Sequence, residues 1–184
     1  MDIRILKTRT SIFNAFVALR EKKDLEKITV KELTENAQIS KQTFYLHYMD
    51  IYDLSEQIED ELVNELLASL SHKENVLAHI GETTVELFSN ATAKGKLFKV
   101  IFSGSRVNNL VSSIESKLKQ MIYTENPELR SDLSTNIYIT VLVQGCYFAY
   151  QKYSSIDSER VAKILGKVSN SITECYLQDK LNTL

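Results

Sequence analysis

Apolar residues follow a helical period between residues 28 and 54, and this stretch is the most informative part of the chain. In its first half they recur at spacings of three and four, at Val30, Leu33 and Ala37. This spacing predicts a short helix with one apolar face. Phe44 and Tyr48 are four residues apart, so both are predicted to face inward from a second short helix. The pattern therefore predicts two short helices joined by a tight turn.

Three polar residues in this stretch are suited to begin helices. Thr29 and Glu32 have the spacing of a capping box, in which each side chain accepts a hydrogen bond from the backbone N–H of the other residue. Ser40 precedes the second helix and Asp50 precedes a third, and both residue types are favoured as N-caps. The three helices are thus predicted to begin near residues 30, 41 and 51.

The second short helix has an outward face whose residues do not belong to its apolar, inward-facing set. At about 100° per residue, Gln42 and Leu46 point away from Phe44. Side chains that can contact nucleic acid flank them, at Lys41, Thr43, Tyr45 and His47. Leu46 either meets a thymine methyl group or is an inert exposed residue. Two short helices with a polar and aromatic outer face are typical of a helix-turn-helix, whose second helix enters a DNA major groove.

This stretch resembles the N-terminal region of the TetR/AcrR family of bacterial transcriptional regulators. After an apolar helix, that region usually reads I-T-x-x-x-[IL]-A-x-x-A-G-V-S-x-x-T-[FLI]-Y-x-[HY]-F-x-[ND]-K-x-x-L. The matching residues are Ile28, Thr29, Leu33, Ala37, Ile39, Ser40, Thr43, Phe44, Tyr45, His47, Tyr48, Asp50 and Leu54. The match covers the N-terminal part of the chain, and the remainder fits the family in outline.

Two positions depart from the family pattern. Gln38 stands where the family usually has a turn glycine, so a residue with a side chain has to adopt the left-handed conformation, at a cost of about 1 kcal/mol. Ile51 stands where the family commonly has a lysine that contacts a phosphate, so the resemblance does not supply that contact here. Both departures favour the alternative function, a helical adaptor that kept the helix-turn-helix fold without specific DNA binding.

The resemblance implies a set of DNA-contacting side chains, namely Thr29, Lys31, Ser40, Lys41, Gln42, Thr43, Tyr45 and His47. Lys41, Gln42 and Tyr45 are the candidates for base edges, because lysine donates to guanine and glutamine can bracket adenine. Lys31 is a candidate for a base or a phosphate. The remaining side chains are better suited to phosphates, which position a protein on the duplex.

The apolar period continues on both sides of this stretch. A first helix over about residues 3–21 is predicted to pack five apolar side chains against the next two helices, namely Ile5, Ile12, Phe13, Phe16 and Leu19. Further helices are predicted over about residues 51–70, 75–91, 107–122, 128–153 and 157–179. Five Gly and one Pro in 184 residues disfavour β-rich folds and long loops. We therefore predict an all-α protein, with a helix-turn-helix DNA-binding domain over residues 1–54 and a helical ligand-binding and dimerisation domain over residues 55–184.

The segment from Ile137 to Tyr150 is apolar nearly all round. A helix of this kind has to be covered on both sides. In the TetR/AcrR family the last two helices of each subunit form a four-helix dimer interface, and helices over about 128–153 and 158–179 resemble them. The resemblance thus implies a homodimer that reads a palindromic operator. The alternative is a central helix enclosed within one monomer.

The resemblance also implies a cavity in the second domain, whose occupant changes the separation of the recognition helices. Seven aromatic residues are candidates to line it, namely Phe88, Phe98, Phe102, Tyr123, Tyr138, Tyr147 and Phe148. They suggest a small apolar or aromatic effector. Each of them is alternatively an ordinary core residue.

Charge is divided unevenly along the chain. Residues 1–48 hold nine Lys and Arg against six Asp and Glu, whereas residues 49–184 hold thirteen against eighteen. The basic part is the part with the predicted helix-turn-helix, as phosphate neutralisation requires. Arg4, Lys7 and Arg9 either contact phosphates or form a solvated helix end.

Several classes of function lack support in the sequence. No phosphate-binding loop, nucleophile elbow or zinc-protease motif occurs, so we do not expect an enzyme. Cys146 and Cys175 are too few for a zinc site or a disulfide framework, and we expect no metal or cofactor. His72 and His79, seven residues apart in a polar region, are expected to be surface residues. The sequence has neither an 18-residue apolar run nor a secretory signal, so no membrane contact is expected. The resemblance implies a cytoplasmic, nucleoid-associated bacterial repressor.

Overall fold

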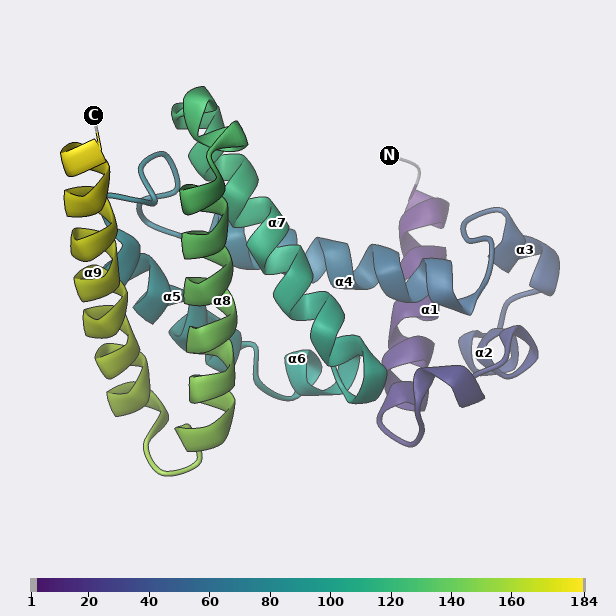
Figure 1. The fold of residues 1–184 in the computed structure, drawn as a ribbon. Helices are drawn as coiled ribbons and strands as arrows, with labels where there is room; N and C mark the ends of the chain where they lie inside the picture. The colour runs from purple at the N-terminus through teal and green to yellow at the C-terminus, as the bar shows by residue number, and fades with distance from the viewer. Residues whose placement is uncertain (1–2, 184) are drawn as a thin grey trace. The chain divides into compact units, whose positions relative to one another are not determined.

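The computed structural model describes residues 3–183, apart from the side chains of residues 179 and 181–183. Figure 1 shows that this part of the chain is helical and contains no strand. The α-helices are α1 (Ile3–Arg20), α2 (Val30–Ala37), α3 (Lys41–Tyr45), α4 (Ile51–Ala68), α5 (Ile80–Ala93), α6 (Gly95–Ile101), α7 (Val107–Glu125), α8 (Leu133–Tyr153) and α9 (Ser158–Thr183). Short 3-10 helices lie at η1 (Leu25–Lys27), η2 (Gly104–Arg106) and η3 (Pro127–Ser131). The predicted all-α fold class is confirmed.

The chain forms two compact units. The first runs to Leu62 and also includes Gly95–Val107, so it contains α1 to α3, most of α4, α6 and η2. The second contains Val63–Lys94 and the chain from Asn108 onward, and therefore the end of α4 together with α5, α8, α9 and nearly all of α7. The predicted functional division at residue 54 stays a prediction.

In the first unit, α2 packs on α1 and on α3, and α6 packs on α1. The side chains at the centre of this unit are fully buried, namely Ile12, Phe16, Leu33, Phe44 and Leu54. The prediction that Ile5 packs in this core is wrong, because its side chain is 43% exposed. Ile5 lies in the N-terminal part of α1, where the described residues before Ile12 are exposed or half-buried.

All three predicted N-caps are present in this unit. The Thr29 hydroxyl accepts a hydrogen bond from the N–H three residues later at 3.3 Å, and the Ser40 hydroxyl does the same at 3.0 Å. The Asp50 carboxylate accepts from the N–H groups two and three residues later, each at 2.8 Å. Each cap satisfies N–H groups that the first turn of a helix leaves without an intrahelical partner.

The second half of the predicted capping box does not form. Instead of reaching back to the Thr29 N–H, the Glu32 carboxylate accepts a hydrogen bond from Lys23 Nζ at 2.6 Å. The ammonium group comes from the loop after α1, so a contact between segments replaces the local one.

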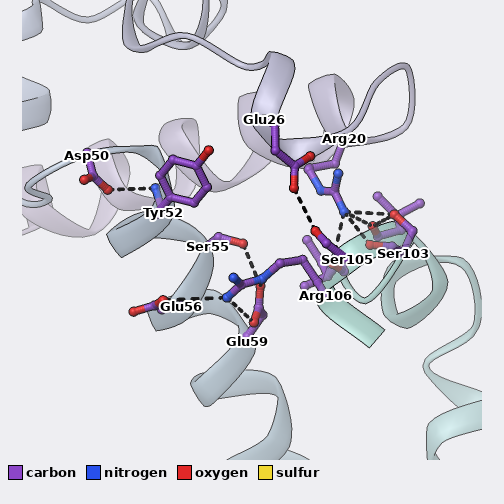
Figure 2. A network of polar contacts seen from close by, with 12 residues as sticks. Arg20, Glu26, Asp50, Tyr52, Ser55, Glu56, Glu59, Ser103, Ser105 and Arg106 are labelled. Atoms are coloured by element: carbon purple, nitrogen blue, oxygen red, sulfur yellow. Dashed lines mark hydrogen bonds and ion pairs between the residues drawn. The ribbon is translucent and has the colours of Figure 1, made fainter. Parts of the chain in front are cut away.

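Figure 2 shows how two arginines hold the segment 95–107 in the first unit. Arg20, at the end of α1, donates from Nη2 to three backbone carbonyls of that segment at 3.2–3.3 Å and to Ser103 Oγ at 2.8 Å. Burial lowers the pKa of the Arg20 guanidinium. Because a guanidinium group carries five N–H donors, one side chain can bind several carbonyls at the end of a short helix.

The second arginine, Arg106, binds the Glu59 carboxylate of α4 through both Nε and Nη2, at 2.7 and 2.8 Å. Ser55 Oγ also donates to Glu59, at 2.6 Å. Hydrogen bonding to Glu59 raises the pKa of the Arg106 guanidinium. These contacts connect η2 to α4 through a nearly buried ion pair (Figure 2).

In the second unit, α9 packs against both α5 and α8, and α8 and α9 run side by side in opposite directions (Figure 1). α5 and α9 approach closely at Gly81 and Gly166. A Cβ atom on Gly166 would lie 2.7 Å from the carbonyl oxygen of Gly81. The Gly81 N–H donates to Asn170 Oδ1 at 2.9 Å, so the close approach also provides a hydrogen bond between the two helices.

Three predicted helix ends differ from those observed. α5 begins at Ile80 and not near residue 75, because residues 71–79 form a series of turns. α8 begins at Leu133, after the 3-10 helix η3 that starts at Pro127, and the Asp132 carboxylate caps it. α9 extends beyond the predicted end near residue 179. Within the described residues, no helix combines the length and apolar character needed to span a membrane.

Candidate nucleic-acid interface

The orientation of α3 is set by two aromatic side chains that lie in the core of the first unit. Phe44 is fully buried and Tyr48 nearly so, and their ring centroids are 5.6 Å apart. Burial raises the pKa of the Tyr48 hydroxyl. Tyr48 follows α3, and its N–H donates to the Phe44 carbonyl at 3.0 Å, so the helical spacing extends to it. Because both rings lie in the core, the opposite side of this segment has to point outward.

That outer face carries side chains that the core does not use. Tyr45 is 56% exposed and Leu46 is 78% exposed, and Lys41 and Gln42 are also exposed. The Tyr45 ring contacts the edge of Phe44, with centroids 5.4 Å apart, so the core orients an otherwise exposed aromatic group. This outer face, made by Lys41, Gln42, Tyr45 and Leu46, is called the α3 face below.

Three further candidates are partly engaged in local structure. The hydroxyl groups of Ser40 and Thr43 are hydrogen-bonded to each other at 2.8 Å, in addition to the cap. Thr43 and His47 are half-buried. The His47 ring lies 6.2 Å from that of Tyr48.

Two candidates lie on α2. Thr29 is exposed at the N-terminus of that helix, and its hydroxyl accepts the capping bond. The Lys31 side chain is largely exposed, with Nζ 4.0 Å from Glu35 Oε1. An exposed ion pair at this distance contributes little, so the ammonium can reorient toward another anion. All eight candidates thus lie in the first unit, on α2, on α3 or directly beside them, and their contact with DNA stays a prediction.

Met49 is 79% exposed just after α3 and was not among the predicted DNA-contacting residues. It lies in the loop between α3 and α4, outside the helical period that identified the other residues. The signal in the sequence that could have identified it is an apolar residue directly after the second short helix and outside its apolar period.

The positive charge of the N-terminal region is partly neutralised by pairing. Arg9 binds Glu61 at 2.6 Å and Lys27 binds Asp24 at 2.7 Å, while Arg20 is buried against backbone carbonyls. Not every cation counted in this region is therefore free to bind a phosphate. Lys41 on the α3 face and Lys31 on α2 are both exposed.

The turn between α2 and α3 has the backbone conformation predicted from the resemblance. Gln38 lies in the left-handed region, with φ 55° and ψ 42°. Its N–H donates to carbonyls at the end of α2 and its side chain is exposed. Ile51 is 5% exposed and belongs to the core, so its side chain is not positioned to replace the phosphate-contacting lysine of the family.

Replacing Gln38 with glycine is expected to stabilise the protein by about 0.5–1 kcal/mol, because glycine adopts the left-handed conformation without a Cβ clash. The gain is limited because glycine also has more conformational freedom in the unfolded chain. Urea denaturation measures the change. Glu35→Gly in the exposed interior of α2 is the matched control and is expected to destabilise by about 1 kcal/mol. Destabilisation by Gln38→Gly would contradict the strain assigned to this turn.

The seven aromatic residues predicted to line a cavity are distributed over both units. Phe98 and Phe102 are buried in the first unit, with ring centroids 5.1 Å apart. The others belong to the second unit, namely Phe88, Tyr123, Tyr138, Tyr147 and Phe148. Of these, Tyr123 and Tyr138 are buried and Phe148 is 56% exposed. Their role in ligand binding stays a prediction.

A hollow of about 500 Å³ lies between α5 and α9, within the second unit. It is lined by Gly81, Glu82, Val85, Glu86, Lys163, Gly166, Lys167 and Asn170. None of the seven predicted aromatic residues is among them.

α8 and α9 carry exposed apolar side chains at helical spacing. On α8 these include Ile137, Val141 and Phe148, each 55–57% exposed. On α9 they include Ile164, Val168 and Ile172, which recur every four residues and are each at least 36% exposed. These six residues are called the α8–α9 apolar stripe below. In the single chain this stripe is not enclosed.

No protein-family model matches the chain, and no curated protein matches it either. Among solved structures, a gamma-butyrolactone receptor described as ArpA-like is similar, with a TM-score of 0.50 and 13% identity over 92% of this chain and 99% of that one. The TetR family repressor AlkX from Dietzia sp. strain DQ12-45-1b has a TM-score of 0.49 and 14% identity over 92% of this chain and 95% of that one. The dihydroxyacetone kinase operon activator DhaS has a TM-score of 0.48 and 16% identity over 94% and 95% of the two chains.

At these identities the likeness concerns the fold. The similarity to the receptor extends over nearly the whole length of both chains. The protein therefore has an all-α fold like that of the gamma-butyrolactone receptor, with an N-terminal helix-turn-helix followed by a larger helical region.

Proposed function

We propose that this chain is a DNA-binding transcriptional repressor that recognises a palindromic operator as a homodimer. The observation that carries the proposal is the α3 face, whose side chains point outward while Phe44 and Tyr48 occupy the core. In a helix-turn-helix this helix enters the major groove and its exposed side chains contact base edges. The proposed domain division follows, with residues 1–54 for DNA and residues 55–184 for ligand binding and dimerisation.

The residues of the proposed DNA site have distinct roles. Lys41, Gln42 and Tyr45 contact base edges, because they are exposed on the α3 face and carry hydrogen-bonding groups. Lys31 contacts a base or a phosphate from α2. The short polar side chains and His47 contact phosphates, with Thr29 and Ser40 doing so beside the N–H groups of a helix start.

The α8–α9 apolar stripe supports dimerisation. A run of exposed apolar side chains along two adjacent helices is unfavourable in water, and burying it against a second copy removes that cost. Two helices from each copy would form a four-helix contact. A dimer also presents two α3 faces to DNA, and these can bind half-sites about 34–36 Å apart.

Replacing Val141 with glutamate is expected to weaken dimerisation at least about 100-fold, or about 2.8 kcal/mol, because an unpaired charge would be buried in the contact. Light scattering coupled to gel filtration over a dilution series measures it. Ile156→Glu is the matched control, since Ile156 is 81% exposed in the turn between α8 and α9, outside the stripe. The proposed interface would be contradicted if the Val141→Glu protein remained dimeric, or if the unmodified protein were monomeric.

DNA binding is tested by mobility shifts of the purified protein with the DNA upstream of its own gene. The proposal expects a specific shift that weakens steeply with salt, because each neutralised phosphate releases counterions. A reporter gene controlled by that upstream DNA should be transcribed more strongly when the gene for this protein is deleted. No shift at about 1 µM protein and low salt would favour the helical adaptor instead, since even non-specific binding is detectable near this concentration.

We assign to the second domain a small apolar or aromatic effector that releases the operator. The structurally similar gamma-butyrolactone receptor is, by its name, a receptor for a small organic molecule. A hundredfold loss of operator affinity requires the effector to favour the released state by about 2.8 kcal/mol. Candidate compounds can be screened by release of labelled operator DNA.

A further inference from the structure

The connection between α4 and α5 brings two histidines together beside the start of α5. Residues 71–79 form turns, and the segment is fastened to α5 at two points. The Ser71 N–H donates to Glu86 Oε2 at 2.8 Å, and Asn90 Nδ2 donates to Ser69 Oγ at 3.0 Å. Folding of this connection, and not sequence spacing, therefore positions His72.

His72, His79 and Glu82 form a compact cluster. His72 Nε2 lies 2.9 Å from Glu82 Oε2, and His79 Nδ1 lies 3.3 Å from the same oxygen. The two imidazole rings are stacked, with centroids 3.9 Å apart and an interplanar angle of 10°. One ligand atom from each residue lies within 4.8 Å of the others. Their side chains are 40% and 37% exposed, so both histidines lie at the surface, as expected, and the fold also brings them together.

These distances agree with those between ligands of one metal ion. Zinc bonds to imidazole nitrogen and carboxylate oxygen are about 2.0–2.2 Å long, so neighbouring ligands of a tetrahedral ion are about 3.3 Å apart. The two nitrogen–oxygen distances in the cluster are close to that value. The two rings are nearly parallel, so at least one imidazole ring has to rotate before both in-plane nitrogen lone pairs and the oxygen point at one ion.

The donor set indicates the class of ion. Two imidazole nitrogens and one carboxylate oxygen suit Zn²⁺, Ni²⁺ and Cu²⁺. Ca²⁺ and Mg²⁺ prefer oxygen ligands throughout. Three protein ligands leave a fourth tetrahedral position for water or an added ligand. Glu82 also lines the hollow between α5 and α9, so solvent reaches the carboxylate.

We propose that His72, His79 and Glu82 bind one divalent transition-metal ion, with Zn²⁺ as the representative. The ion joins the α4–α5 connection to the first turn of α5 and adds to the hydrogen bonds already made by Ser71 and Asn90. This site lies in the second unit and does not depend on the proposed DNA contacts.

Calorimetric titration of the full-length, untagged, chelator-treated protein with ZnCl₂ tests the proposal. The expected result is one saturable Zn²⁺ per chain, together with a higher thermal unfolding temperature. MgCl₂ in the same titration should give no saturable binding. His72→Asn and Glu82→Gln are each expected to weaken Zn²⁺ binding at least about tenfold, because each removes a direct ligand.

The chain offers matched controls for this experiment. His47 is the one histidine of the sequence outside the cluster, and Cys175 is an exposed thiol. His47→Asn and Cys175→Ser should both keep the affinity of the unmodified protein. Circular dichroism verifies that each variant is folded, and His79→Asn replaces any variant that is not. Absence of one-to-one binding, unchanged binding in all three cluster variants, or loss of binding in a control would overturn the proposal.

Discussion

Replacement of Tyr45 with alanine is expected to lower specific operator affinity about tenfold to a hundredfold, since one good contact with a base edge contributes about 1–3 kcal/mol. The side chain is 56% exposed on the α3 face, so most of its surface is available to DNA. Affinity is measured by fluorescence anisotropy with labelled operator at fixed salt. Binding to unrelated DNA should change much less, because that binding depends mainly on phosphates.

Helix content has to be measured beside affinity, because the edge contact between Tyr45 and Phe44 contributes to folding. Such an aromatic pair contributes about 0.5–1.5 kcal/mol, which a folded domain tolerates. Tyr153→Ala, at the end of α8 and 47% exposed, is the matched control and should leave operator affinity unchanged. A collapse of the circular dichroism signal on Tyr45→Ala would place Tyr45 in the core. Unchanged operator affinity in a folded Tyr45→Ala variant would show that Tyr45 does not contact DNA.

Removal of the Arg106 side chain is expected to destabilise the protein by about 3–5 kcal/mol, because it leaves the Glu59 carboxylate buried without its cation. The two side chains are only 12% and 8% exposed, and two hydrogen bonds of 2.7 and 2.8 Å join them. Urea denaturation of Arg106→Ala measures the loss. Removing both partners, as in Arg106→Met with Glu59→Leu, should restore much of it, since the uncompensated charge is then absent.

The exposed pair between Lys163 and Glu159 on α9 is the matched control for this experiment. Both side chains are more than 60% exposed, and they lie four residues apart on one helix. Lys163→Ala is therefore expected to change the unfolding free energy by less than about 0.5 kcal/mol. Equal losses in the two variants would mean that burial of the Arg106 pair does not determine its contribution.

The helix-turn-helix was predictable because the interactions that form it are local. Thr29, Ser40 and Asp50 cap helices through N–H groups two or three residues away, and sequence spacing reveals such caps directly. The inward direction of Phe44 and Tyr48 follows from the helical period, and the exposure of Leu46 follows from theirs. The left-handed conformation of Gln38 was predicted from the family resemblance, because Gln38 stands where that family usually has a turn glycine.

Failures of the sequence prediction occur where distant segments compete with local contacts. Glu32 was expected to complete a capping box, but Lys23 provides an ammonium group that binds its carboxylate more strongly than a neutral N–H does. The start of α5 was predicted about five residues early, because the apolar period cannot reveal the turns that fasten residues 71–79 to α5.

Local pattern by itself determined the all-α class, the helix starts around the helix-turn-helix and the outward direction of the α3 face, because these depend on interactions within about one helical turn. Tertiary structure alone decided the attachment of segment 95–107 by Arg20 and Arg106 and the meeting of His72, His79 and Glu82. It also decided the close approach of α5 and α9. These contacts depend on the path of the chain between segments and on the directions of individual side chains, which no periodic pattern encodes.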